Sequence, residues 1–309
     1  MKVIKNLKYY GYLGFQVVYV TTLLKKITKG YFKSDKSYMQ DRFLKSLSYP
    51  LNLKNPVSLN EKLQFLKSIY KEELHAQVSD KYRVRDFLRD KFGEEFLIPL
   101  VLVTNDPKEV NFNTIPDFPV IVKANHDSGN HQIIRDKKKV NWRRLQIDCK
   151  WWLSWNYYYS DRELQYKAIK RKIIVEKLLL TKEGKIPNDY KLNYIDGKLE
   201  FVYVSVDREG GNYRNIYNAD WQPLHFKWAS FKKVSKIKRG PEIPSPLSYE
   251  KMKELGAEIA KLFPYVRVDF YDVDGKLYFG EVTLCHGGGF FKFEPQEIDF
   301  ELGEKLTIR

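Results

Sequence analysis

The stretch YVRVDFYDVDGKLYFGEVTLCHGGG, residues 265–289, contains two strand-like segments joined by a turn. In the first segment apolar residues alternate with charged or aromatic ones, which is the period-two pattern of a strand with one apolar face. Turn-forming residues follow at Asp272–Gly275, where the glycine tolerates positive φ. Leu277–Leu284 is then expected to return as the partner strand. The stretch therefore predicts an antiparallel hairpin.

Three charged residues of this hairpin are expected to project from one side, namely Arg267, Asp269 and Glu281. Mg²⁺ prefers one or two carboxylates together with phosphate oxygens. A magnesium-bound polyphosphate would therefore satisfy both carboxylates and the guanidinium. Gly287–Gly289 follows directly and allows the backbone to approach a ligand closely. The alternative is an ordinary hairpin whose charges are solvated.

Seven further blocks of sequence accompany the hairpin in a fixed order. They are Asn55–Lys67, Ser79–Leu88, Gly93–Leu100, Val120–Gly129, Ile173–Leu179, Asp189–Leu192 and Arg214–Trp221. Together with the hairpin they resemble the ATP-grasp ligases, whose hairpin reads roughly R-x-D … E-x-N … P-G. More closely they resemble the TupA-like branch, which is found with bacterial surface-polysaccharide genes. The resemblance extends from about Leu51 to the C-terminus.

The resemblance implies an α+β ATP-grasp fold, in which two α/β lobes clasp a nucleotide behind a helical N-terminal region. Four parts are expected. Residues 1–28 would form an interfacial amphipathic helix, and residues 29–105 a mostly helical region. Residues 106–178 would form the ATP-grasp lid lobe, and residues 179–309 the C-terminal lobe that carries the metal-binding hairpin.

The apolar strand predicted at Phe118–Asn125 carries Lys123 close to its end. Burying an ammonium group without a counter-anion is expensive, so a phosphate partner is one interpretation. The other is that the lysine extends its charged end into solvent. By the resemblance, Lys123 would hold nucleotide phosphates, and the loop containing Ser128 and Gly129 would fold over them. That loop has one glycine where family members often carry more.

The remaining nucleotide contacts are also implied by the resemblance. They are Glu176, Lys177 and Leu179 at the adenine, Asp189 at the ribose and Lys191 at the phosphates. ATP and Mg²⁺ are therefore the expected cofactors.

The same resemblance assigns the metal and catalytic residues. Asp269 and Glu281 would hold Mg²⁺, and Arg267 would steady the transferred phosphoryl group. Arg214 would clamp a phosphate in the transition state, the alternative being a structural ion pair. Thr283 stands where many ATP-grasp enzymes place an asparagine metal ligand. Since a hydroxyl binds Mg²⁺ weakly, the number of metal ions stays open.

The overall charge of the chain narrows the choice of partners. The 309 residues carry a formal net charge of +15, and 15% of them are aromatic. Such a surface attracts polyanions. No nucleic-acid-binding motif is present, so an anionic membrane surface or an acidic glycan is expected and nucleic acid is not. Only Cys149 and Cys285 occur, which is consistent with a reducing, cytoplasmic compartment.

The N-terminal segment contains a charge-free run, Tyr9–Leu24, with lysines before and after it. It is short and rich in tyrosine for a spanning helix. A helix lying in the membrane interface fits better, which would place the protein at the inner face of the bacterial cell membrane. The alternative is a helix packed on the protein's own core.

These features favour an ATP-dependent carboxylate–amine ligase that acts through an acylphosphate, because such chemistry needs positioning and charge neutralisation more than a protein nucleophile. The resemblance implies that it joins an amino acid or amine to a uronic acid, or to another carboxylate of a capsule or O-antigen glycan that could be lipid-linked. One alternative is a glycosyltransferase, suggested by the D-x-D spelling of Asp272–Asp274. Another is a non-catalytic polyanion-binding protein at the membrane surface.

Overall fold

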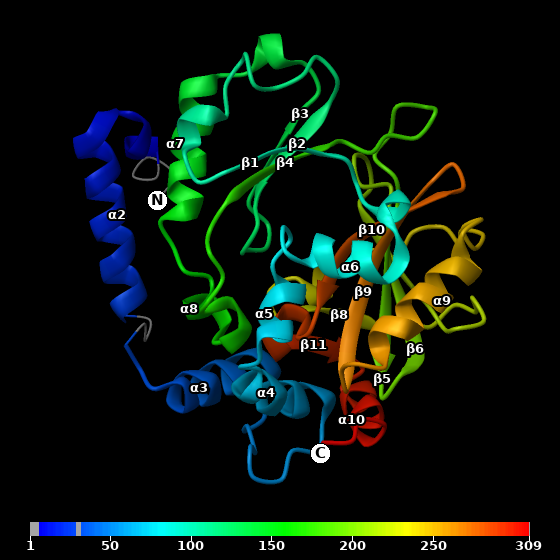
Figure 1. Cartoon of the computed structure of the whole chain (residues 1–309). Helices are drawn as coiled ribbons and strands as arrows, with labels where there is room; N and C mark the ends of the chain where they lie inside the picture. Colours follow the sequence, from blue (N-terminus) through cyan, green and yellow to red (C-terminus); the bar gives the residue numbers. More distant parts are fainter. Residues whose placement is uncertain (1–5, 29–31, 309) are drawn as a thin grey trace.

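The computed structural model describes residues 6–28 and 32–308, and it places two sheet-containing lobes side by side with the N-terminal helices around them (Figure 1). The N-terminal helices are α2 (Gly11–Thr28), α3 (Asp35–Leu47), α4 (Leu59–Ile69), α5 (Glu73–Ser79) and α6 (Val84–Phe92). A capping box lies at the start of α4, within the first of the family-like blocks. Ser58 Oγ accepts from the Glu61 amide at 3.1 Å, and Glu61 Oε2 accepts from the Ser58 amide at 3.0 Å.

The first lobe is a four-stranded antiparallel sheet ordered β1-β4-β2-β3. Its strands are β1 (Leu100–Thr104), β2 (Val120–Ala124), β3 (His131–Ile134) and β4 (Ile173–Lys177). Helix α7 (Trp142–Leu153) packs on this sheet and buries Leu145 and Cys149 against Val122 and Val175. The short helix α8 (Tyr158–Asp161) follows. The sequence predicts that the lid lobe begins at residue 106, which is after β1. In the structure β1 is a strand of this lobe's sheet.

The second lobe is a five-stranded antiparallel sheet ordered β10-β9-β5-β6-β7. Its strands are β5 (Asp189–Ile195), β6 (Lys198–Val206), β7 (Tyr213–Tyr217), β9 (Tyr265–Val273) and β10 (Lys276–Thr283). Helix α9 (Tyr249–Ala260) packs on this sheet. A two-stranded sheet of β8 (Lys227–Ser230) and β11 (Phe291–Glu294), followed by α10 (Glu297–Glu304), completes the lobe.

The predicted hairpin is confirmed: β9 and β10 pair antiparallel around Asp274 and Gly275, both with positive φ. One detail differs from the expectation of a single buried face, because Arg267 and Asp269 are buried as well as the apolar residues between them. A bulge at Gly280 shifts the register of β10, so that Glu281 lies opposite Asp269. The charged face is therefore part of the interior and not a solvated surface.

The Ser79–Leu88 block does not form one continuous helix. Helix α5 ends at Ser79 and α6 begins at Val84. Between them the Asp80 carboxylate accepts from the Tyr82 amide at 2.9 Å and from Asn125 Nδ2 at 2.8 Å. The side chain thus offers the backbone a turn in place of a continuous helix, and it fastens that turn to the end of β2.

Helix α2 packs along α7, and this contact answers part of the question about the N-terminus (Figure 1). The Phe15 and Trp151 rings meet edge to face at 5.6 Å between centroids, and Tyr19 stacks on Trp155 at 4.7 Å. The opposite side of α2 exposes an apolar stripe, consisting of Leu13, Val17, Val20 and Leu24. None of the described helices is long and apolar enough to cross a bilayer. Residues 1–5 of the expected interfacial segment lie outside the described residues.

A buried carboxyl group, Glu163, lies in the segment after α8 and is only 4% exposed. Burial and the neighbouring Asp161 charge raise its pKa from the usual value near 4.5 to about 8. Gln165 Nε2 donates to Glu163 Oε2 at 3.0 Å. Glu163 is therefore expected to be largely protonated in the folded protein at neutral pH.

This protonation state gives a prediction for Glu163→Gln. The unfolded chain releases the Glu163 proton near pH 4.5 and the folded protein near pH 8, so wild-type stability falls as the pH rises through that window, by up to about 1.4 kcal/mol per pH unit. Glutamine does not titrate. The unfolding free energy of the variant, relative to wild type, should therefore rise from pH 5 to pH 8 in urea titrations. Glu301→Gln at an exposed position is the control, and a pH-independent difference for Glu163→Gln would contradict the assignment.

Candidate active site

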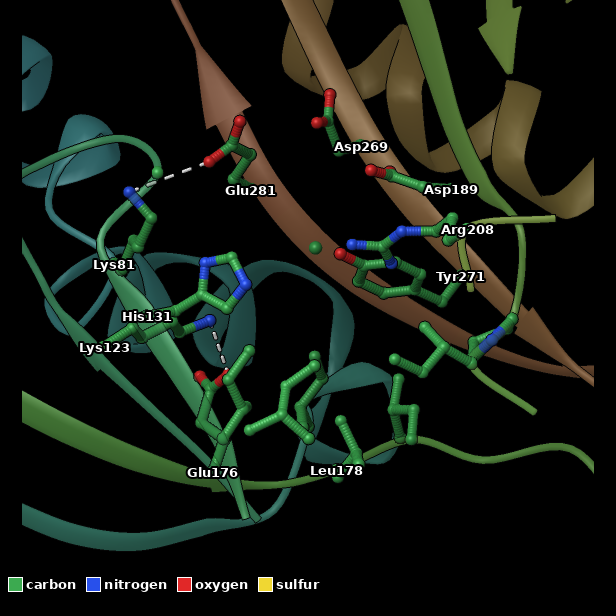
Figure 2. A pocket seen from close by; sticks show the side chains of 18 of the residues that line it. Lys81, Lys123, His131, Glu176, Leu178, Asp189, Arg208, Asp269, Tyr271 and Glu281 are labelled. Carbon is green, nitrogen blue, oxygen red and sulfur yellow. Dashed lines mark ion pairs between the residues drawn. The ribbon is translucent and has the colours of Figure 1, made fainter. Parts of the chain in front are cut away.

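A cleft between the two lobes is lined by charged side chains that face one another (Figure 2). Lys81, Lys123, His131 and Glu176 line it from the first lobe and the α5–α6 turn. Asp189, Arg208, Asp269, Tyr271 and Glu281 line it from the second lobe. Cations and carboxylates thus face each other across a space that both lobes must be present to form.

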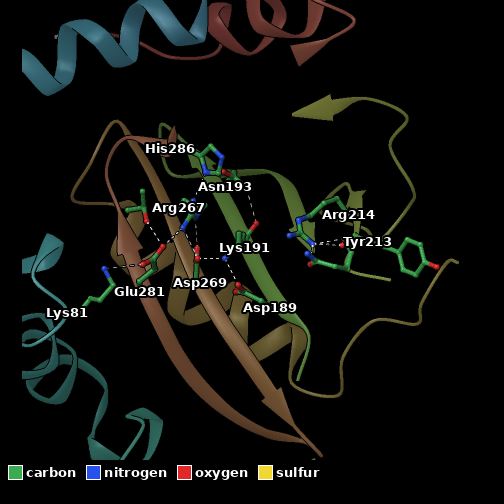
Figure 3. A network of polar contacts seen from close by, with 12 residues as sticks. Lys81, Asp189, Lys191, Asn193, Tyr213, Arg214, Arg267, Asp269, Glu281 and His286 are labelled. Carbon is green, nitrogen blue, oxygen red and sulfur yellow. Dashed lines mark hydrogen bonds and ion pairs between the residues drawn. The ribbon is translucent and has the colours of Figure 1, made fainter. Parts of the chain in front are cut away.

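The second-lobe wall is a continuous network centred on Arg267 (Figure 3). Arg267 Nε donates to Asp269 Oδ1 at 2.5 Å and its Nη2 donates to Asp269 Oδ2 at 2.7 Å, while Nη2 also donates to Glu281. Lys191 Nζ lies 2.6 Å from both Asp269 Oδ2 and Asp189 Oδ2. Each buried carboxylate therefore has a cationic partner, which burial requires.

Sheet register explains why residues so distant in sequence meet in this network. Lys191 on β5 lies opposite Asp269 on β9, and Glu281 on β10 lies opposite the same Asp269. Three adjacent strands thus present their charged residues in one row. The Gly280 bulge is needed for this row, because strict pairing would place Gly280 opposite Asp269. A Cβ at Gly280 would also lie 3.2 Å from the Asp269 carbonyl oxygen.

Burial and charge act differently on the two carboxylates. Burial raises the pKa of Asp269 to about 6, even though Arg267 and Lys191 oppose the shift. Burial would also raise the pKa of Glu281, but Lys81, Arg267 and Lys191 together hold it well below its usual range. Glu281 is thus a firmly ionised carboxylate at neutral pH.

On the first lobe, Lys123 is ion-paired and its ammonium group does not extend freely into solvent. Its Nζ lies 2.6 Å from Glu176 Oε2, and Arg85 Nη1 approaches the other carboxylate oxygen at 3.5 Å. His131 is the cross-strand neighbour of Lys123. Glu176, on the neighbouring strand of the same sheet, is therefore the counter-anion of Lys123. The two interpretations of the sequence, a phosphate partner or an ammonium group in solvent, did not include this ion pair.

The expected loop over the phosphates joins β2 to β3. Gly129 lines the cleft with φ of 94°, a conformation that favours glycine, whereas Ser128 is exposed and outside the cleft lining. Lys81 Nζ donates to the Asp127 carbonyl oxygen at 2.6 Å, and Asn130 Nδ2 donates to Asp127 Oδ2 at 2.6 Å. The loop is thus held at its base and open at its tip.

A family model described as TupA-like ATPgrasp matches residues 61–307, which include every strand of this cleft. The chain belongs to the TupA-like ATP-grasp family. The fold is accordingly ATP-grasp, as the sequence motifs predict. A search of curated proteins found no match.

Solved structures similar to this TupA-like chain include ATP-grasp ligases at low identity. The D-alanine–D-alanine ligase from Bacillus anthracis complexed with ATP is 16% identical, with 68% of this chain and 54% of that chain covered and a TM-score of 0.37. The D-alanine–D-alanine ligase from Helicobacter pylori is 14% identical, with 84% of this chain and 71% of that chain covered and a TM-score of 0.41. The ATP-grasp ligase PsnB complexed with its minimal precursor is 15% identical, with 73% of this chain and 58% of that chain covered and a TM-score of 0.37. The chain thus spans little more than half of the Bacillus anthracis and PsnB proteins.

Most residues expected from the TupA-like resemblance come together in the cleft. Those that line it are Lys123, Gly129, Glu176, Lys177, Leu179, Asp189, Lys191, Asp269 and Glu281. Arg267 lies directly behind Asp269 and Glu281 and bonds to both. Thr283 Oγ1 donates to Glu281 Oε1 at 3.3 Å, beside the cleft lining.

Arg214 is the expected catalytic residue that the structure does not bring into the cleft. It lies on β7, and its Nη1 donates to Asn212 Oδ1 at 2.7 Å and to the Tyr213 carbonyl oxygen at 2.8 Å (Figure 3). These local contacts fit a structural role better than a phosphate clamp.

Three cleft residues had no firm role in the sequence interpretation. Lys81 has no role beyond its place in the Ser79–Leu88 block, yet its Nζ lies 3.7 Å from Glu281 Oε2. The sequence interpretation gave Arg208 and Tyr271 no role. In the structure the Arg208 guanidinium carbon lies 5.8 Å from the centroid of the Tyr271 ring. The usable signal for Lys81 was its position after Asp80, where the helix breaks. The Arg208 loop carries no comparable signal.

One end of the cleft has an apolar wall, and two backbone amides beside it are hydrogen-bonded within the TupA-like chain. The Lys177 amide donates to the Pro99 carbonyl oxygen and the Leu178 amide to that of Pro119, both at 2.9 Å. Those two amides are therefore engaged. The apolar wall consists of Ile98, Ile121, Ile133, Leu178, Leu179 and Ile186. Nearby, the buried Asp189 Oδ1 has no hydrogen-bond partner among residues 6–28 and 32–308, so a ligand hydroxyl could complete it.

The donor set fits Mg²⁺ in company with phosphate. Within the described part of the chain, no three His, Cys, Asp or Glu side chains are grouped to hold a metal ion by themselves. Asp269 and Glu281 supply two adjacent carboxylates, and Mg²⁺ needs only one or two when phosphate oxygens complete its shell. Lys81, Lys123 and Arg208 supply positive charge for such phosphates. Thr283, hydrogen-bonded to Glu281, adds at most a weak ligand.

A first prediction concerns Lys191, the cation shared by Asp189 and Asp269. Lys191→Met should lower the unfolding free energy by about 3 kcal/mol at pH 7.5, because two buried carboxylates lose a partner. The loss should shrink at pH 5, where the Asp269 carboxyl group, whose pKa burial raises to about 6, takes up a proton. Urea unfolding measures both values. Lys198→Met, whose side chain is 79% exposed, should change stability by less than about 0.5 kcal/mol; an equal loss in both variants would refute the shared-cation assignment.

Proposed function

We propose that this protein is an ATP-dependent carboxylate–amine ligase. The observation that carries the proposal is the cleft itself, in which Lys123 from one lobe faces Asp269 and Glu281 from the other. Membership in the TupA-like ATP-grasp family supports a nucleotide as the ligand. The apolar wall near Leu179 suits a base, and the charged floor suits polyphosphate.

Each residue then has a task set by its position. Leu179 and Lys177 border the adenine, and the unpartnered Asp189 oxygen accepts from the ribose. Lys123 and Lys191 contact phosphate oxygens, which requires Lys123 to exchange Glu176 for the ligand. Gly129 lets the β2–β3 loop close over the phosphates.

The reaction proceeds in two steps. A substrate carboxylate attacks the γ-phosphorus of ATP, which forms an acylphosphate and releases ADP. An amine then attacks the acyl carbon, so that an amide forms while phosphate and a proton leave. Asp269 and Glu281 would hold Mg²⁺, which would neutralise phosphate charge. Arg267 stabilises the charge that develops on the transferred group through its remaining Nη1 hydrogen.

For the substrates we propose an amino acid or amine and a carboxylate-bearing glycan such as a uronic acid polymer, a capsule or O-antigen component that could be lipid-linked. The net charge of +15 supports an acidic partner. The basic run at Lys227–Arg239 exposes Lys232, Lys233, Lys236 and Lys238 beyond the buried Trp228. The Asp272 carboxylate of the D-x-D sequence accepts from Ser248 and Gly275, which is a turn-forming role and supplies no sugar-nucleotide site.

We further propose that α2 rests on the anionic inner face of the cell membrane. Its inner side is fixed to α7, so its exposed apolar stripe is presented outward on a rigid support. Lys25, which is exposed in the last turn, suits anionic headgroups. A lipid-linked glycan would then be within reach of the same surface.

The ligase proposal predicts ADP release from ATP in the presence of magnesium, screened against uronic acids paired with amino acids. Asp269→Asn and Glu281→Gln should each lower that rate about 100-fold or more, because the charge on the phosphates is no longer balanced. Asp274→Asn, in the turn of the same hairpin, is the matched control and should keep the wild-type rate. If both cleft variants release ADP as fast as wild type, the metal assignment is wrong.

The membrane proposal predicts co-sedimentation of the protein with phosphatidylglycerol vesicles. The double variant Leu13→Glu, Val20→Glu should bind about 10-fold or more weakly, since two carboxylates enter the apolar contact while the α7 contact is kept. Leu247→Glu, at an exposed leucine on a different part of the chain, should bind like wild type. Unchanged binding of the double variant would remove α2 from the proposal.

A further inference from the structure

His286 is a buried histidine to which the proposed reaction assigns no task. It begins the turn η7 (His286–Gly289) after β10 and is 6% exposed. Its Nδ1 lies within hydrogen-bonding reach of Arg267 Nη1 (Figure 3). The imidazole stacks on Trp228 with centroids 3.7 Å apart, and the Phe291 ring meets it edge-on at 4.8 Å. The ring is thus fixed on two sides and bonded at its edge.

The chemistry of the pair determines the form of the imidazole. A guanidinium can only donate hydrogen bonds, so Nδ1 of His286 must be the acceptor and the ring proton must reside on Nε2. Burial, together with the positive charges of Arg267 and Lys191, holds the pKa of His286 well below its usual range. The side chain is therefore a neutral acceptor at physiological pH.

Arg267 has three acceptor groups in this network, and they differ in kind. Two of them, the Asp269 and Glu281 carboxylates, are the residues proposed to hold magnesium. A divalent cation beside them would compete with the guanidinium for the same oxygens. The imidazole of His286 is the acceptor that such a cation leaves untouched, because its Nδ1 already points at the guanidinium.

The turn that carries His286 is itself anchored. Gln64 Nε2 donates to the carbonyl oxygens of Gly288 at 2.9 Å and Gly289 at 2.6 Å, and Lys67 Nζ donates to that of Gly288 at 2.7 Å. Both side chains come from α4. Gly288 has φ of 62°, and a Cβ there would lie 2.7 Å from the Asp161 Cβ. The turn is therefore held in one conformation that aims the imidazole at Arg267.

We propose that His286 is a positioning residue that holds the Arg267 guanidinium in place behind Asp269 and Glu281 when these two carboxylates bind magnesium. The inference rests on the proposed function for its catalytic consequence. The structural part of the inference does not depend on the reaction: His286 is neutral, its ring stacks on Trp228 and its Nδ1 accepts a hydrogen bond from Arg267.

Two substitutions separate the acceptor from the ring. In His286→Asn the Oδ1 atom, attached to Cγ like Nδ1, can accept from Arg267; in His286→Gln the oxygen is one bond further and cannot occupy the same place. His286→Gln should lower kcat for ADP release about 100-fold, as expected for a misaimed catalytic group, while the Kd for magnesium-ATP stays within about threefold. His286→Asn should keep kcat within about fivefold of wild type. Equal losses in both variants would overturn the proposal.

A spectroscopic measurement tests the same inference without turnover. The chain has five histidines, so ¹⁵N-histidine labelling gives few resonances, and the signal missing from His286→Asn assigns His286. Nδ1 should show the shift of an unprotonated acceptor from pH 8 to pH 6, with and without magnesium and ATP. A protonated Nδ1, or an Nδ1 that loses its hydrogen bond when magnesium and ATP are added, would refute the positioning role.

The two measurements keep the failures apart. If wild type releases no ADP with any substrate pair, the ligase proposal fails, and the nitrogen shifts with magnesium and ATP still decide the role of His286. If wild type turns over and His286→Asn is as slow as His286→Gln, the ligase proposal stands and the positioning role falls.

Discussion

The buried ion pair between Arg267 and Asp269 is the constraint on which the second lobe depends. A charge in this position is tolerated only because the neighbouring strands bring Lys191 and Glu281 into contact with it. That requirement fixes the register of β5, β9 and β10, since a slip by one residue would turn each charge towards the apolar core. Stability and site geometry are therefore set by the same contacts.

The sequence was sufficient for the fold because its strongest signals are local. The β9–β10 hairpin has regular alternation and glycine at its turn, and the capping box at Ser58 needs four residues only. Both kinds of signal depend only on residues that are neighbours along the chain, so they can be recognised without knowledge of the tertiary structure. The ordered series of family-like blocks extended this information to the strands that line the cleft.

The errors lie where a distant partner decides the outcome. Lys123 pairs with Glu176, a residue of the neighbouring strand, and the sequence could not show that pairing. The break after Ser79 is stabilised by Asn125, which lies 45 residues beyond Asp80. Arg214 is a different case, because its partners, Asn212 and Tyr213, are its neighbours in sequence, and residue type alone does not distinguish such local contacts from a phosphate clamp. The sequence places His286 directly before three glycines. Its role as a hydrogen-bond acceptor depends on contacts with Arg267 and Trp228, which the sequence does not reveal.

The Lys123–Glu176 pair has one further implication. The ligand-free cleft carries its own internal counter-ions, so an incoming anion must break an existing pair before it gains a new one. A single weak charge gains too little to offset that cost, whereas several phosphates acting together can. The cleft should therefore discriminate between ligands by their total negative charge as well as by their shape, and nucleoside monophosphates should compete poorly for it.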